Sequence, residues 1–326
     1  TVEIEDVNEY LDENKEIEVA VMGLLCLNCN DAELKKVYDP KYKVKNAVIL
    51  IHGLASSPAT YEHIIKDIKM TDQPFQAWIF GYPTTREIID NAKDLANQLE
   101  KNQEEFENVY IAAHSLGGII SQQALYYAEQ ENLKTPGKFK FINKVRSVVA
   151  IGTPNEGIPI GPYKKLFQHI IDLKTKDNLF DMDNELVQKL SKGLITPQVE
   201  GIEYYVIAGD KPYPFSSIFF EKELGREKVI EANDGIVGVK SAQNIGGEYK
   251  NNECVDFWQL SLTHTELLDN PIGRKQIEKI VSQEVLEETD LKVIMGKNQF
   301  YQFHISECNE DDMYIAIGKK LEDREV

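Results

Sequence analysis

The strongest constraint on the fold is the segment 109–118, where an apolar strand pattern runs directly into a helical pattern. Ser115 stands at the junction, with the small residues Ala113 two positions before it and Gly117 two positions after it. This spacing is that of a G-x-S-x-G turn, in which larger side chains would collide because the strand-to-helix turn is tight. The segment therefore predicts a strand, a sharp turn and a helix, with Ser115 as a candidate nucleophile.

Strand and helix patterns alternate on both sides of this segment. A continuous apolar run, typical of a parallel strand covered on both faces, occurs at 47–51. Further strand patterns occur at 76–80, 145–151, 204–208 and 255–260. Helical spacing appears at 85–100, with Thr84 or Thr85 as the expected N-cap, and at 271–281. We therefore expect an α/β fold with a mostly parallel, doubly wound sheet, in a main domain spanning 46–284.

Three further segments surround or interrupt this domain. Residues 1–45 are expected to form an N-terminal appendage, and residues 285–326 a small β-rich C-terminal appendage with strand patterns at 291–295, 299–305 and 313–317. Residues 158–200 carry two amphipathic helical patterns, which favour an inserted lid, although ordinary packing helices give the same pattern. Gly193 is the expected C-cap of the second helix.

Composition excludes several classes of partner. The 326 residues are 42% hydrophobic, enough for a sizeable core, and carry a formal charge of −18, which disfavours nucleic acid and anionic membrane surfaces. The apolar run at 19–27 is far shorter than the ~20 residues that span a bilayer, so no transmembrane segment is expected. Cys26 and Cys29 form a C-x-x-C pair, which leaves a disulfide, an incidental pair and a zinc site open. Because the first residue is Thr1, we expect a processed, secreted product or a trimmed chain, and the compartment stays open.

A serine hydroxyl becomes a nucleophile when a histidine accepts its proton and a carboxylate orients that histidine, here in the chain order serine, acid, histidine. His264 is the expected base because it follows the last predicted sheet strand in a polar loop, where we expect a partly exposed imidazole. His304 lies inside a strand pattern and is expected to be structural. Asp234 in an N-D-G turn is the leading acid, and Asp210, directly after the strand at 204–208, is the alternative.

An oxyanion hole needs two converging backbone N–H donors. One is expected from Leu116, the residue after the serine, and the other from Leu54 in the turn that follows the strand at 47–51. Gly53 lets the backbone of this turn approach a substrate. His52 in the same turn is expected to orient the loop rather than to act as a base.

Taken in chain order, these blocks resemble the α/β-hydrolase lipases, including bacterial triacylglycerol lipases and GPI-inositol-deacylase-like hydrolases. The resemblance covers about 46–282 and implies an α/β-hydrolase catalytic domain with Asp234 as the triad acid and Leu54 as an oxyanion donor. Two positions depart from the family: Ala113 replaces the first elbow glycine, and Asn155 stands where many of these lipases have histidine. The matching blocks are His52-Gly53-Leu54, Ala113-His114-Ser115-Leu116-Gly117-Gly118, Ile151-Gly152-Thr153-Pro154-Asn155-Glu156-Gly157, Asn233-Asp234-Gly235-Ile236-Val237 and His264.

Some bacterial lipases of this family also hold a structural calcium ion through a carboxylate two residues after the catalytic histidine. Glu266 occupies that position, and Asp210 is a candidate partner, since hard oxygen ligands suit calcium. No organic cofactor is expected.

The expected function is that of a serine hydrolase that cleaves carboxylic esters, as a lipase or carboxylesterase acting on a lipid or another ester. The same residues also fit a thioesterase or acyltransferase, and the fold alone fits a non-catalytic interaction module. Oligomeric state does not follow from the sequence. Aromatic and aliphatic residues between Asp210 and Asp234 are expected to line an acyl pocket, cover a lid or belong to the core; they are Tyr213, Phe215, Ile218, Phe219 and Phe220.

Overall fold

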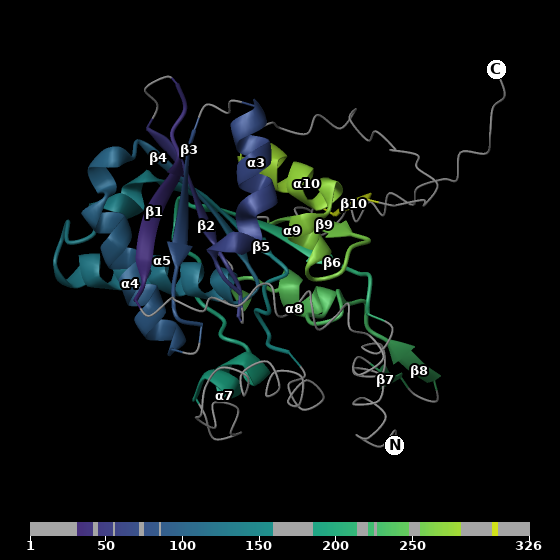
Figure 1. The fold of residues 1–326 in the computed structure, drawn as a ribbon. Coiled ribbons are helices and arrows are strands. Elements are labelled where there is room, and N and C mark those ends of the chain that lie inside the picture. Colours follow the sequence, from purple (N-terminus) through teal and green to yellow (C-terminus); the bar gives the residue numbers. More distant parts are fainter. Residues whose placement is uncertain are drawn as a thin grey trace.

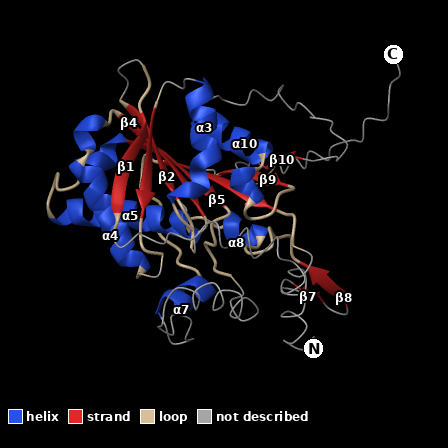
Figure 2. Cartoon of the chain, in the orientation of Figure 1, coloured by secondary structure: helices blue, strands red, loops and turns tan. Residues whose placement is uncertain are grey.

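The protein is an α/β structure with one large sheet between two layers of helices (Figures 1 and 2). The computed structural model describes residues 31–41, 45–54, 56–71, 75–84, 86–158, 185–213, 221–224, 227–247, 255–281 and 302–305. Within this part of the chain, no helix is both long and apolar enough to cross a membrane.

Eight of the described strands form the large sheet, and two form a separate antiparallel ribbon. The strands are β1 (Glu33–Tyr38), β2 (Asn46–Ile51), β3 (Gln76–Gly81), β4 (Asn108–His114), β5 (Val145–Ile151), β6 (Glu203–Gly209), β7 (Glu221–Leu224), β8 (Glu227–Ile230), β9 (Asp256–Leu260) and β10 (Gln302–Ile305).

Most helices connect consecutive strands of this sheet. The α-helices are α3 (Glu62–Thr71), α4 (Ile88–Lys101), α5 (Leu116–Lys134), α7 (Glu185–Lys192), α8 (Val239–Gln243), α9 (Glu266–Asp269) and α10 (Pro271–Val281), and the 3-10 helices are η1 (Pro58–Tyr61), η2 (Gln103–Glu105) and η3 (Lys140–Lys144).

The strand order of the large sheet is β1-β3-β2-β4-β5-β6-β9-β10. The six central strands are parallel, and β1 and β10 pair antiparallel with β3 and β9 at the two edges. The chain steps from β2 to β3 in one direction and then returns to place β4 on the other side of β2, so the winding reverses between β2 and β4. This arrangement confirms the predicted doubly wound sheet, and it makes the carboxyl ends of β2 and β4 the expected location of a binding site.

The sheet is buried on both faces. Along β2, Ile49 and Ile51 belong to the core shared with α4 and α5, whereas Val48 and Leu50 face the core shared with α3 and α10. Because successive side chains of a strand point to opposite faces, a strand covered on both sides must be apolar at every position. This requirement explains the continuous apolar run at 47–51 from which β2 was predicted.

The two edge strands lie in the segments 1–45 and 285–326, which were expected to form appendages. β1 has the sequence ELKKVY, in which Glu33, Lys35 and Lys36 are charged, so it contains no continuous apolar run. Charged side chains are common on edge strands because they discourage pairing with another chain. The sheet therefore extends beyond the boundaries at 45 and 285.

Other expectations differ from the structure or lie outside the described residues. The N-cap of α4 is Glu87, without a side-chain hydrogen bond, so the prediction of Thr84 or Thr85 as the cap was wrong. Gly193 directly follows α7 with φ +77°, as expected of a C-cap. The predicted features outside the described residues are the run at 19–27, the C-x-x-C pair of Cys26 and Cys29, the first lid helix, and the strands at 291–295 and 313–317.

Candidate active site

The turn between β4 and α5 has an unusual backbone. Ser115 has φ 54° and ψ −124°, and it is the non-glycine residue with positive φ among those described. Its N–H donates to the Ile151 carbonyl at 2.8 Å, and its own carbonyl accepts from Gly118 N–H at 3.0 Å. A non-glycine residue in such a region costs about 1–3 kcal/mol and persists only where neighbouring structure holds it. The turn thus presents Ser115, partly exposed, between buried residues.

Small residues around Ser115 allow the end of β2 and the serine turn to approach each other closely. A Cβ on Gly117 would lie 2.5 Å from the carbonyl oxygens of Ile51 and His52, and a Cβ on Gly53 would lie 2.8 Å from the Ser115 Cβ. Any larger residue at these two positions would therefore separate the end of β2 from the turn. The loop carrying Leu54 consequently lies directly against Ser115.

Two backbone N–H groups in this region are the expected oxyanion donors. Leu116 is the first residue of α5. The first N–H groups of an α-helix have no acceptor within the helix, and the N–H of Leu116 is one of them. Leu54 follows Gly53 in the neighbouring loop and is partly buried. The helix N-terminus also favours negative charge, which suits an oxyanion.

His52 holds the loop in place through both of its ring nitrogens. Its Nδ1–H donates to the Gly53 carbonyl at 3.1 Å, and its Nε2 accepts from the Tyr82 N–H at 3.4 Å. The rings of His52 and Tyr82 are stacked with their centroids 4.3 Å apart, and the Tyr82 hydroxyl donates to the His52 carbonyl at 2.6 Å. Burial, which outweighs the hydrogen bond to Gly53, lowers the pKa of His52 to about 4. These contacts suit a residue that orients the loop.

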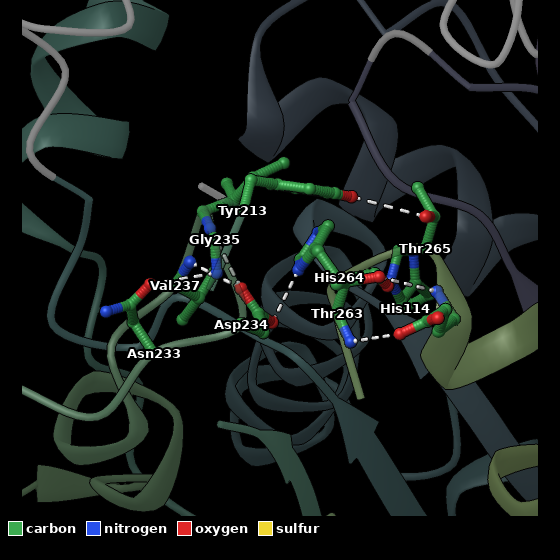
Figure 3. Close-up of polar contacts among 11 residues, drawn as sticks. His114, Tyr213, Asn233, Asp234, Gly235, Val237, Thr263, His264 and Thr265 are labelled. Carbon is green, nitrogen blue, oxygen red and sulfur yellow. Dashed lines mark hydrogen bonds and ion pairs between the residues drawn. The ribbon is translucent and has the colours of Figure 1, made fainter. Parts of the chain in front are cut away.

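Asp234 and His264 form a buried pair beside the turn (Figure 3). His264 Nδ1–H donates to Asp234 Oδ2 at 2.7 Å, while Asp234 Oδ1 accepts from the N–H groups of Ile236 at 3.0 Å and Val237 at 2.7 Å. The backbone N–H of His264 also donates to the Asp234 carbonyl at 2.8 Å. Such a carboxylate fixes the tautomer and the orientation of the imidazole, leaving Nε2 as the acceptor.

Gly152 connects this pair with the serine turn. It follows Ile151, the residue that accepts from Ser115 N–H, and a Cβ on it would lie 3.1 Å from His264 Nδ1 and 3.2 Å from Asp234 Oδ2. Its φ is +53°, a conformation that favours glycine. In the sequence, Gly152 stands out only as part of a matching block, because its role depends on residues distant in the sequence.

The loop of His264 is more enclosed than expected. His264 is 5% exposed, which corrects the prediction of a partly exposed imidazole. On one side, Thr263 N–H donates to Glu266 Oε2 at 2.9 Å. On the other side, the Tyr213 hydroxyl contacts Thr265 Oγ1 at 3.2 Å across the pair, as Figure 3 shows. Tyr213 therefore covers the Asp234 turn, whereas the aromatic residues that follow it lie outside the described part of the chain.

The calcium candidates contact other side chains. Both carboxylate oxygens of Glu266 accept from Lys211 Nζ, at 2.9 and 3.0 Å, and Asp210 Oδ2 accepts from Gln259 at 2.7 Å. Partial burial is the largest single influence on Glu266 and raises its pKa, but the hydrogen bonds from Lys211 and Thr263, together with the charge of Lys211, lower that pKa overall. No group of three or more His, Cys, Asp and Glu side chains able to hold a metal occurs within the described ranges. The calcium site stays a prediction from the resemblance.

Asn155, the second departure from the family that the sequence resembles, bridges two helices. Its amide donates to the Ala242 carbonyl at the end of α8 at 2.8 Å and accepts from Gln122 of α5 at 3.0 Å. Asn155 is 1% exposed, so both ends of the amide require such partners. We interpret Asn155 as a residue that holds α8, and with it the nearby Asp234 turn, against the helix after Ser115.

A methyl group at position 152 should disturb the Asp234–His264 pair. Gly152→Ala is expected to lower the free energy of unfolding by about 1–3 kcal/mol more than Gly137→Ala, because only the former adds overpacking. Gly137 also has positive φ, +77°, but nothing lies within 4 Å of an added Cβ, so it controls for backbone strain. Urea denaturation measures the free energy of unfolding of both variants, and an equal decrease in the two would contradict the crowding at Gly152.

Acid should destabilise the fold through its buried neutral histidines. The pKa of His52 is lowered to about 4 and that of His114 well below its ordinary value, in both cases chiefly by burial. Unfolding then takes up protons below pH 6.5, so stability falls as pH falls, with His52 alone contributing about 2 kcal/mol between pH 7 and 5. Urea denaturation at several pH values measures how steeply the free energy of unfolding falls as pH falls. His52→Gln should make this dependence less steep, and an unchanged dependence would contradict a neutral, buried His52.

Comparison with protein-family models and with curated protein sequences finds no match. Solved structures do match. The mature form of the Bacillus licheniformis lipase BlEst2 has 18% sequence identity and a TM-score of 0.52, over 76% of this chain and 98% of that chain. The propeptide form of the same lipase has 19% identity and a TM-score of 0.50, over 78% of this chain and 54% of that chain.

Other matching structures include a lipase-esterase related protein from Clostridium acetobutylicum, with 15% identity, a TM-score of 0.42, and coverage of 76% of this chain and 98% of that chain. At these identities the likeness concerns the fold. Together with the mostly parallel sheet and its flanking helices, the match to the mature lipase supports one conclusion: the chain has the α/β-hydrolase fold found in lipases and esterases.

Proposed function

We propose that this protein is a serine hydrolase that cleaves carboxylic esters, with Ser115 as the nucleophile, His264 as the base and Asp234 as the acid of the triad. The observation that carries the proposal is the buried hydrogen bond between His264 and Asp234, located beside the strained turn of Ser115. A buried histidine–carboxylate pair next to a serine held in an unfavourable backbone conformation is the arrangement that nucleophilic catalysis requires.

The tautomer of His264 determines the direction of proton transfer. Because Nδ1–H donates to Asp234, the lone pair of the neutral imidazole is at Nε2, which can accept the Ser115 proton. Ser115 Oγ then attacks the carbonyl carbon of the ester, and the negatively charged carbonyl oxygen is stabilised by the N–H groups of Leu54 and Leu116. Asp234 stabilises the imidazolium that forms.

The second half of the reaction reuses the same groups. The imidazolium of His264 gives its proton to the departing alcohol oxygen, leaving Ser115 acylated. Water, activated by His264 Nε2, attacks the acyl carbon, and release of the carboxylic acid regenerates Ser115.

The proposed substrates are esters, with a lipase or a carboxylesterase as the two variants of the activity. The similar Bacillus licheniformis protein is named a lipase, which favours testing long acyl chains. Hydrolysis rates for p-nitrophenyl esters of short and long acyl chains distinguish the two variants, and product analysis distinguishes hydrolysis from acyl transfer or thioester cleavage.

Removal of the nucleophile should abolish the chemistry without unfolding the protein. Ser115→Ala is expected to lose labelling by a fluorophosphonate probe and to lower p-nitrophenyl ester hydrolysis by roughly 10⁶-fold, because no acyl-enzyme can form. Ser121→Ala is the matched control, since Ser121 lies six residues further along the chain in α5 and donates to the Gly118 carbonyl, which also accepts from Gln122. Turnover retained by Ser115→Ala would refute the proposed nucleophile.

The two candidate acids give a second test. Asp234→Asn is expected to lower kcat about 10⁴-fold, because the amide cannot stabilise the imidazolium and favours the wrong tautomer. Asp210→Asn should change kcat less than about threefold, since Asp210 contacts Gln259 rather than His264. Steady-state kinetics with one p-nitrophenyl ester compares kcat of the two variants. A larger decrease in kcat for Asp210→Asn than for Asp234→Asn would make Asp210 the acid of the triad.

A further inference from the structure

His114, the residue directly before Ser115, lies between the serine turn and the loop of the base. Its Nε2–H donates to the backbone carbonyl of His264 at 3.0 Å, and the two imidazole rings contact each other with centroids 4.5 Å apart (Figure 3). The mechanism proposed above uses no atom of His114. A buried titratable side chain in contact with the base nevertheless needs an explanation.

His114 is a neutral donor. Burial, and then the neighbouring imidazole of His264, hold the pKa of His114 well below its ordinary value, and the hydrogen bond to the His264 carbonyl does not compensate. Nδ1 is buried and has no hydrogen-bond partner among the described residues. It faces Gly53, where an added Cβ would lie 3.3 Å away. The hydrogen bond from Nε2 is thus the polar contact that fixes this ring.

We propose that His114 is a positioning residue that sets the distance between His264 and Ser115, an inference that rests on the proposed function. Asp234 fixes His264 through the ring Nδ1 and through the backbone N–H. His114 fixes the His264 carbonyl and belongs to the same rigid turn as Ser115. Together the two contacts determine how far the imidazole lies from the nucleophile, and small displacements of such groups are costly for catalysis.

Two substitutions of His114 separate the hydrogen bond from the shape of the side chain. His114→Gln retains an amide N–H at the position of Nε2, whereas His114→Leu fills similar space without a donor. We expect kcat to fall roughly 10- to 100-fold in His114→Leu with KM changed less than about twofold, and we expect His114→Gln to stay within about threefold of the wild type. His114→Asn, whose shorter amide cannot reach the carbonyl, should behave like His114→Leu and replaces it if that variant fails to fold.

A readout independent of turnover is the low-field proton resonance of the hydrogen bond between His264 and Asp234. This resonance should shift or broaden in His114→Leu and should be restored in His114→Gln, whereas a purely structural role would lower the melting temperature alone. Equal kcat values in the Leu and Gln variants, together with an unchanged resonance, would overturn the proposal. A wild-type protein that hydrolyses no ester would contradict the proposed function, and the resonance would then still test the positioning.

Discussion

The backbone conformation of Ser115 is the constraint on which the rest of the site depends. A residue with φ 54° and ψ −124° is stable only because the Ile151 carbonyl accepts its N–H and because Gly117 allows α5 to approach the end of β2. Both contacts come from strands that are parallel to β4 and end at the same edge of the sheet. The doubly wound topology therefore supplies the free energy that holds the serine in a strained conformation.

The parts of the fold that could be predicted are those with a local physical cause. The central strands are covered on both faces, so their largely apolar patterns located them to within one or two residues. The turn at Ser115 also has a local cause, because a tight strand-to-helix turn requires small residues at fixed spacing. β1 and β10 were assigned to appendages instead of the sheet, because an edge strand has no need of a continuous apolar sequence.

The features that could not be predicted depend on contacts between distant residues. His264 was expected in an exposed loop because its neighbours are polar, yet Tyr213 and the Asp234 turn enclose it. The hydrogen bond from His114 to the His264 carbonyl joins residues 150 positions apart. Gly152 lies against the pair of Asp234 and His264, which come from two later segments of the chain. No local pattern carries such information, and the family resemblance located Asp234 without describing what surrounds it.

Burial of the site has two consequences that support each other. A low-dielectric environment strengthens the hydrogen bond between His264 and Asp234, because fewer water molecules compete for the carboxylate. The same environment keeps His52 and His114 neutral, as the lowered pKa values of both imidazoles indicate. A positive charge on His114, in contact with His264, would oppose the imidazolium that the proposed reaction forms. Neutral neighbours thus allow three histidines to share one small region while only His264 carries charge during the reaction.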